Sequence, residues 1–272
     1  MKRSNKAPRH KDLLKHVQAT QIREELPLVH VTATGIGRNI LLSGKLETRY
    51  CPHLKENLIY FFLGRPAYRL KGESAPNNQI NRSPIVFIIN PDHVVPKYVF
   101  PFDSGAALTG KYVGEDQALC LNDYELPTSM IGAGQHLAWA FSSVDDYLKG
   151  RVKPNLLDGV EIFETTVHSF SSISKQATKG INNPDRYDDR AAAIEVCSAE
   201  NVDLKSAVSF AIIPKQYLEG VSGKNNTEIL QALKENEIDT IHYDWLPHRD
   251  PEEYRDEINR LVRQHYVTLG LI

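Results

Sequence analysis

Short runs of apolar and β-branched residues recur along the chain and predict strands. The run from Ile85 to Asn90 is apolar at almost every position, which favours a strand in the middle of a sheet. The other predicted strands contain polar residues among the apolar ones, and some of them alternate between the two types. In chain order these are Leu26 to Thr32, Leu58 to Leu63, Gly159 to Val167, Ile194 to Val196 and Ala207 to Ile213.

Helix signals are fewer, and the clearest lie near the C-terminus. Thr227 is placed to cap the segment EILQALKEN. The sequence Asp250-Pro251-Glu252-Glu253 has the composition of a helix start. The helix that follows is expected to be amphipathic, because four residues recur at the spacing of one face: Tyr254, Ile258, Leu261 and Val262.

Two more helices are expected earlier in the chain. One runs from Arg38 to Ser43, after two strand-breaking glycines, and ends at Gly44. The other lies near residues 134–147. Because strands outnumber long helices and do not alternate regularly with them, the predicted fold class is α+β with a mixed or split β-sheet core and flanking helices.

The charges define a basic leader ahead of the predicted core. The leader is expected over residues 1–20, and a single domain over residues 21–272. A net charge of −2 means that binding to a nucleic acid must come from a local basic patch. The leader is one candidate, although a solvated segment is the simpler interpretation. Its cations are Lys2, Arg3, Lys6, Arg9, Lys11 and Lys15, against the single acid Asp12.

Other features exclude several classes of protein. No run approaches the roughly 18 apolar residues of a membrane helix, and no apolar stretch follows the basic N-terminus, so the expected location is the cytoplasm, with no membrane association. Three distant cysteines and ten histidines without a ligand pattern predict neither a disulfide framework nor a metal site. The chain also lacks a Walker loop and a Gly-x-Gly-x-x-Gly motif, which argues against Rossmann-type dinucleotide binding.

Polar residues interrupt the predicted strands at three places. His30 and Thr32 point to the same face of one strand and can contact one ligand together. Glu195 lies between Ile194 and Val196. The third place is the segment with Tyr60, Arg65, Tyr68 and Arg69. Each also has a structural interpretation: a hydrogen-bonded core histidine, a carboxylate on a solvated face, and arginines reaching water from a strand edge.

In this order, three motifs resemble the ADP-ribosyltransferase fold. They are L-V-H-V-T followed by I-L-L-S-G-K-L, then Y-F-F-L-G-R-P-A-Y-R, and then D-R-A-A-A-I-E-V, spread over about 170 residues. They look most like the bacterial branch that modifies nucleic acids and includes the DarT toxins, which attach ADP-ribose to DNA bases. The resemblance implies NAD as a substrate and no metal.

The resemblance also implies roles for the interrupting residues. Cleavage of the nicotinamide–ribose bond passes through an oxocarbenium-like state, and Glu195 is the implied catalytic residue that hydrogen-bonds the ribose and offsets this charge. The implied NAD-binding residues are His30 and Thr32 at the ribose, Tyr60 against nicotinamide, and Arg65 or Arg69 at the pyrophosphate, with Tyr68 in the same motif.

The implied function is transfer of ADP-ribose to a DNA or RNA base by a toxin or anti-phage defence effector, restrained by an antitoxin or chaperone. The chain departs from the protein-modifying relatives, because Ala193 stands where those that act on arginine carry Glu or Gln, and their Ser-Thr-Ser strand is missing. A protein ADP-ribosyltransferase, an NAD glycohydrolase, an RNA 2′-phosphotransferase and a non-catalytic nucleotide- or protein-binding module remain alternatives. The segment from Pro101 to Tyr112 is expected to be an ordered surface insertion, with a loop that recognises the acceptor as the alternative.

Overall fold

The computed structural model describes residues 1–4, 8–21, 26–68, 79–112, 118–178, 187–220 and 223–272. Internal contacts divide the chain into two compact units, each assembled from three segments. Unit 1 comprises residues 1–26, 49–63 and 95–199, and unit 2 comprises residues 27–48, 64–94 and 200–272. The boundary expected at residue 20 therefore does not coincide with this division, and each unit is described by itself.

A mixed sheet with the strand order β10-β9-β5-β1 forms the centre of unit 2. β1 (Leu28–Ala33), β5 (Pro84–Ile89) and β9 (Val208–Pro214) pair antiparallel, whereas β10 (Asp239–Tyr243) is parallel to β9. Every residue of β5 is buried, and both of its edges are paired. The apolar sequence of this strand had predicted such a central position.

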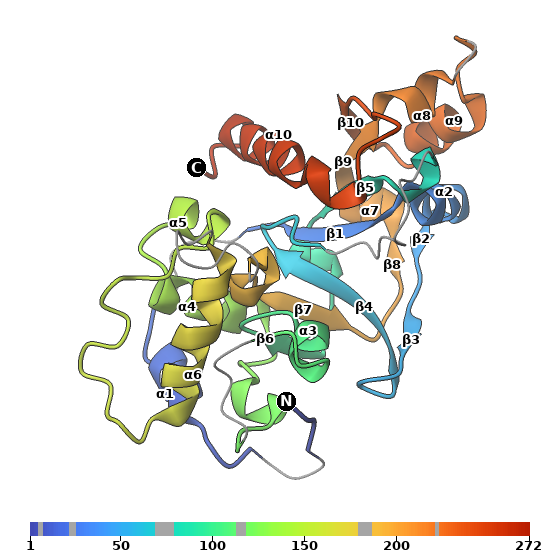
Figure 1. Cartoon of the computed structure of the whole chain (residues 1–272). Helices are drawn as coiled ribbons and strands as arrows, with labels where there is room; N and C mark the ends of the chain where they lie inside the picture. The colour runs from blue at the N-terminus through green and yellow to red at the C-terminus, as the bar shows by residue number, and fades with distance from the viewer. Residues whose placement is uncertain (5–7, 22–25, 69–78, 113–117, 179–186, 221–222) are drawn as a thin grey trace. The chain divides into compact units, whose positions relative to one another are not determined.

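Helices flank the sheet of unit 2. α2 (Thr34–Ser43) packs on β1 and β5, and α10 (Arg255–Thr268) contacts β10 (Figure 1). His265 of α10 stacks on Phe210 of β9, with 3.7 Å between the ring centres. Of the residues predicted to share one helix face, Ile258, Leu261 and Val262 are buried in α10, whereas Tyr254 is buried in the 3₁₀ turn η7 (Pro251–Tyr254) that precedes it. The other elements are β2 (Lys45–Leu46), η1 (Ile80–Arg82), η2 (Pro91–His93), β8 (Val202–Asp203), α7 (Leu204–Ala207), α8 (Lys215–Glu219) and α9 (Thr227–Glu235).

Unit 1 contains four antiparallel strands in the order β3-β4-β7-β6. They are β3 (Arg49–Cys51), β4 (Glu56–Leu63), β7 (Glu195–Ser198) and β6 (Tyr98–Phe100). The helices and 3₁₀ turns of this unit are α1 (Asp12–Gln18), α3 (Ser104–Leu108), η3 (Leu121–Tyr124), α4 (Met130–Ala140), α5 (Val144–Leu148), α6 (Thr165–Ser174), η4 (Lys175–Ala177) and η6 (Asp189–Ala192). The coarse prediction of an α+β protein with a mixed sheet and flanking helices is thus confirmed.

The leader is part of the packing of unit 1 rather than a solvated segment. α1 contacts α4 and α6, and Figure 1 shows these helices together. Leu13 and Val17 are the reason, because both apolar side chains are buried on the inner side of α1. The basic composition of the segment had hidden this short amphipathic helix.

Two predicted elements differ in the structure. Gly159 to Val167 does not form a strand: α6 begins at Thr165, and the apolar side chains of Ile162 and Phe163 are 88% and 71% exposed. Alternation without burial of one face does not produce a strand. The helix expected over residues 134–147 is two helices, α4 and α5, because Ser143 caps a new helix by accepting a hydrogen bond from the backbone N–H of Asp146. In the described part of the chain, no helix has both the length and the apolar character needed to cross a bilayer.

Gly35 and Gly37, the glycines that follow β1, lie inside helix α2. Thr34 opens the helix and donates from both its N–H and its hydroxyl to the carbonyl oxygen of Ser83, at 2.8 and 2.7 Å. Gly37 then faces β5, and a Cβ built at this position would lie 2.3 Å from Cγ2 of Ile85. The glycine therefore allows the close approach of α2 to the sheet.

We predict that Gly37→Ala lowers the free energy of unfolding by about 1–3 kcal/mol, because the added methyl group overpacks the contact with Ile85. Gly35→Ala is the matched control in the same helix, since its new Cβ would lie 3.2 Å from Asn81 and its effect is expected to be smaller. Urea denaturation of both variants measures the difference. Equal stability of the Gly37→Ala variant and the wild type would contradict the close approach.

Candidate functional site

Glu195 is the first residue of β7 and is buried, with an exposure of 2%. In the register of the sheet it pairs with Phe62 of β4 on one side and Phe100 of β6 on the other. Directly paired residues of antiparallel strands share a face, so the Glu195 side chain lies on the same sheet face as these two aromatic side chains. The carboxyl group is therefore shielded from water, and its hydrogen-bond partners are other groups of unit 1.

Ser104 supplies most of those hydrogen bonds. Its hydroxyl donates to Oε1 of Glu195 at 2.5 Å, and its backbone N–H is 3.3 Å from both carboxyl oxygens. Cys197, two residues along the same strand, donates from its thiol to Oε1 at 3.4 Å. Ser104 opens α3 because Asp103 caps that helix, accepting a hydrogen bond from the N–H of Ala106 at 2.6 Å.

An ion-pair network fixes the start of α3. Arg190 donates from Nη1 to Asp103 at 2.8 Å and from Nε and Nη2 to the two oxygens of Asp188 at 2.9 and 2.6 Å. The N–H of Asp103 also donates to the carbonyl oxygen of Arg190 at 3.2 Å. The three side chains are only 12–14% exposed, so this network is a buried connection between α3 and the segment that enters β7.

Burial raises the pKa of Glu195 from 4.5 to about 8, and the nearby charge of Asp103 adds to this effect. The hydrogen bonds from Ser104 and Cys197 act in the opposite direction, because they stabilise the ionised form. The carboxyl group is therefore mostly protonated at neutral pH in the free protein. Such a group can change its protonation state when a positive charge comes close.

Tyr60 lies on the same sheet face as Glu195. It pairs with Cys197, which in turn pairs with Tyr98 of β6, so these three residues form the row beside the Phe62, Glu195 and Phe100 row. Tyr60 is half-buried, and burial raises the pKa of its hydroxyl. The structure thus brings together two of the residues that the sequence predicted for one site.

Tyr112 is a further aromatic side chain near this region. It is 3% exposed, and its ring packs edge-on against Phe102 with 5.6 Å between the ring centres. Its hydroxyl makes no hydrogen bond with any described residue. Burial raises the pKa of this hydroxyl, and the charges of Asp103, Asp188 and Arg190 act on it. A free donor thus lies beside the network that supports Glu195.

The segment from Pro101 to Tyr112 was wrongly expected to be a surface insertion. Most of its apolar side chains are buried, and it supplies Asp103, Ser104 and Tyr112 to the surroundings of Glu195. The sequence carried one signal for this, an Asp-Ser-Gly helix start directly after a predicted apolar run. Cys197, interpreted as an ordinary thiol, is also part of this group, and burial raises its pKa.

The remaining predicted site residues belong to unit 2. His30 and Thr32 lie on β1 opposite Phe87 and Ile85, and they point to one face as expected from their spacing. His30 is half-buried and Thr32 is 9% exposed. Because Tyr60 and Glu195 are in unit 1, the grouping of all these residues around one NAD stays a prediction.

Arg65 and Tyr68 follow the end of β4 and are both buried in unit 2. The hydroxyl of Tyr68 donates to the carbonyl oxygen of Pro251 at 2.7 Å, and the guanidinium of Arg255 lies 5.8 Å from the centre of its ring. Tyr68 therefore anchors the start of the C-terminal helical segment. Arg69, the other arginine predicted for the pyrophosphate, lies outside the described residues.

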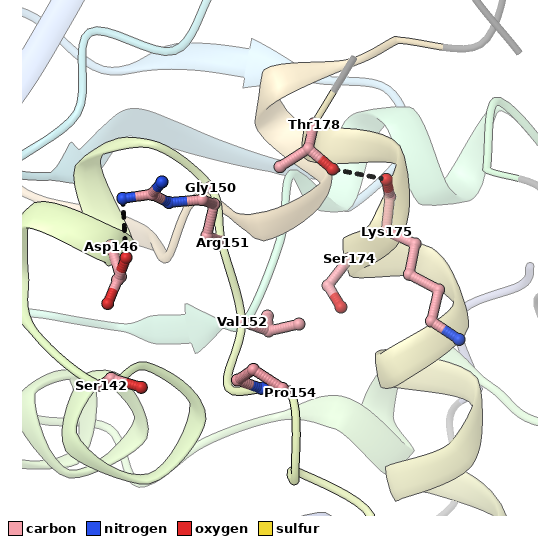
Figure 2. Close-up of a pocket in the computed structure, with 9 residues that line it drawn as sticks. All are labelled: Ser142, Asp146, Gly150, Arg151, Val152, Pro154, Ser174, Lys175 and Thr178. Carbon is pink, nitrogen blue, oxygen red and sulfur yellow. Dashed lines mark hydrogen bonds and ion pairs between the residues drawn. The ribbon is translucent and has the colours of Figure 1, made fainter. Parts of the chain in front are cut away.

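A pocket of about 500 Å³ lies elsewhere in unit 1, between the segment 142–154 and the end of α6 (Figure 2). Arg151 on its rim is already paired with Asp146 at 2.9 Å. No predicted NAD-binding residue lines this pocket. Among the residues that the structure describes, no group of His, Cys, Asp and Glu side chains has the arrangement of a metal site.

We predict that Glu195→Gln stabilises the protein increasingly as the pH rises. The folded protein retains the Glu195 proton up to about pH 8, whereas the unfolded chain loses it near pH 4.5, so the wild type loses stability between these values. Glutamine keeps the shape and does not titrate. The variant's advantage in unfolding free energy should grow by up to about 1.4 kcal/mol per pH unit between pH 5 and 8, as measured by urea denaturation. Parallel pH curves would contradict a protonated Glu195.

We predict that Arg190→Gln lowers the free energy of unfolding by about 2–4 kcal/mol, because it leaves two nearly buried carboxylates, Asp103 and Asp188, without their counter-ion. Arg190→Lys keeps the charge but not the planar fork, and its cost is expected to be smaller. Denaturation at pH 7 compares the two variants. A loss below about 0.5 kcal/mol for Arg190→Gln would show that the network does not hold α3.

Comparison of the chain with protein-family models, curated proteins and solved structures finds no match in any of the three. The resemblance to ADP-ribosyltransferases thus rests on the three sequence motifs. The description of the site rests on the geometry around Glu195.

Proposed function

We propose that the protein is an NAD-dependent ADP-ribosyltransferase that modifies a nucleic acid base, as a toxin or defence effector. One observation carries this proposal: Glu195 and Tyr60 lie on one face of adjacent strands, and Ser104 holds the carboxyl group of Glu195 in a fixed position. The ADP-ribosyltransferase fold belongs to the same proposal. It is supported by the order of the motifs and by a mixed sheet with flanking helices.

Glu195 is the catalytic residue in this proposal. NAD carries a positive nicotinamide ring, and the charge moves to the ribose as the bond between them breaks. When the positive charge of NAD comes close, the protonated carboxyl group of Glu195 releases its proton to the solvent, and the resulting carboxylate stabilises the oxocarbenium-like state. The hydroxyl and N–H of Ser104 already point at the oxygens on which the negative charge develops.

Other residues bind NAD in this proposal. The half-buried ring of Tyr60 offers a flat surface to the nicotinamide, next to the Glu195 row. His30 and Thr32 hold ribose hydroxyls, and Arg65 or Arg69 pairs with the pyrophosphate. These roles come from the sequence motifs. Tyr68 has a supporting role in this proposal, because its hydroxyl donates a hydrogen bond to the carbonyl oxygen of Pro251.

The acceptor is a DNA or RNA base, chosen over a protein side chain because Ala193 is buried and carries no group to orient an arginine acceptor. Transfer to a protein, transfer to water as an NAD glycohydrolase, and a non-catalytic binding module are the alternatives. A toxin of this kind needs an inhibitory antitoxin or chaperone as a partner.

The test is incubation of the purified protein with labelled NAD and, in separate reactions, DNA, RNA and a protein extract. Label is expected on one nucleic acid, and Glu195→Gln is expected to reduce transfer by at least about 100-fold, the size of effect found when a group that stabilises transition-state charge is removed. Glu164→Gln is the matched control, since Glu164 pairs with His16 at 3.0 Å and has no place in the proposed chemistry.

The outcomes separate the alternatives. Release of nicotinamide without transfer in all three mixtures identifies a glycohydrolase, and label on protein alone identifies a protein-modifying enzyme. Unchanged NAD consumption by Glu195→Gln removes this residue from the mechanism. No consumption of NAD by the wild type leaves the binding module.

A further inference from the structure

We propose that a basic surface formed by the β3–β4 hairpin, Lys97 and the N-terminal residues binds the phosphate backbone of a nucleic acid; the choice of partner rests on the proposed function. Its five cations are Lys2, Arg3, Arg49, Lys55 and Lys97, hereafter the basic surface, and all lie in unit 1. This concentration of positive charge stands out in a chain whose net charge is −2.

Most of this charge is free to meet an external anion. Lys2, Arg49 and Lys55 are exposed, and none of them forms an ion pair with a described residue. Glu56 is the carboxylate within the surface, and it pairs with Lys97 and Arg3. Glu125 is a second, half-buried acid; burial raises its pKa, and the charge of Arg3 acts in the opposite direction. Glu56 thus pairs with two of the five cations, and Lys2, Arg49 and Lys55 remain without an ion pair among the described residues.

Arg3 ties the N-terminal residues to the hairpin. It donates from Nη1 to the carbonyl oxygen of Leu54 at 2.6 Å and from Nη2 to the hydroxyl of Tyr98 at 2.7 Å. Its guanidinium lies 5.0 Å from the centre of the Tyr98 ring, and Nζ of Lys97 lies 5.7 Å from the same centre. Arg3 and Lys97 are therefore held in position around the ring of Tyr98 and are not independent side chains.

The basic surface continues into the row beside Glu195. Arg49 pairs with Leu58, and Cys51 pairs with Glu56, so Arg49 and Glu56 share the sheet face of Tyr60. Tyr98 is in the row of Cys197 and Tyr60, next to the row of Glu195. The basic surface thus borders the sheet face that carries Glu195, on which Leu58, Cys197 and Phe100 are buried.

The chemistry of the surface favours a nucleic acid over other polyanions. Separated cations on a strand, a hairpin turn and the N-terminal residues match phosphates repeated along a backbone, and the aromatic side chains on the same face can stack on bases. The described residues of the surface include no helix that could enter a groove, which fits a single strand better than a duplex.

The test measures binding of a fluorescently labelled single-stranded oligonucleotide by anisotropy, without NAD, over a series of salt concentrations. The double variant Arg49→Glu with Lys55→Glu is expected to bind at least about 10-fold more weakly. The slope of log K against log[salt] is negative, and its magnitude should decrease by about 1.4 in this variant. This is about 0.7 for each of the two phosphates of a single strand that the protein no longer neutralises. Lys224→Glu with Lys234→Glu changes the net charge equally at two exposed positions of unit 2 and is the matched control.

Two results overturn the inference: no binding by the wild type, or equal weakening by both double variants. The milder pair Arg49→Gln with Lys55→Gln, monitored by circular dichroism, distinguishes weaker phosphate binding from impaired folding. Because binding is measured without NAD, an inactive but oligonucleotide-binding protein would refute the proposed function and leave the basic surface standing. An active protein whose binding is insensitive to Arg49 and Lys55 would do the reverse.

Discussion

Burial of the Glu195 carboxyl, on the sheet face that it shares with Phe62 and Phe100, is the constraint on which the arrangement of unit 1 depends. A buried carboxyl is costly unless it is protonated or hydrogen-bonded, and here both conditions hold. Each bond requires a further support: Ser104 needs the start of α3, that start needs Asp103, and Asp103 needs Arg190. The cost of burying one polar group thus accounts for the chain of contacts that joins α3 to the segment before β7.

The sequence predicted the strands well where burial and periodicity agree. β1, β4, β5 and β9 lie within a few residues of their expected positions, and Glu195 begins the strand in which it was expected. It failed where packing decides the conformation. Gly35 and Gly37 look like strand breakers, yet they sit inside α2 because the helix approaches Ile85 closely. The alternating segment after Gly159 pairs with no strand among the described residues, so its pattern has no consequence.

The site could be predicted only in part, because its key contacts are distant in sequence. Ser104 is 91 residues from Glu195, and no local pattern joins them. Tyr60 and Tyr68 are close in sequence and belong to one motif, so the sequence alone could not show which of them is able to contact a ligand. The structure separates them: Tyr60 is half-buried on the Glu195 face, whereas the hydroxyl of Tyr68 is bonded to Pro251. The surroundings of a residue, rather than its type, decide whether it can meet a ligand.

The same distinction applies to the charges. The cations of the leader look alike in the sequence, but Arg3 is fixed between Glu56 and Tyr98, while α1 turns Leu13 and Val17 inward. Arg49 and Lys55 of the basic surface come from the β3–β4 hairpin, whose sequence shows no cluster of basic residues. Net charge describes the long-range field of a protein, whereas recognition of phosphates depends on where unpaired cations meet. Folding brings the leader and the hairpin to one face, and this assembly gives a slightly acidic chain a positive surface beside its buried carboxyl.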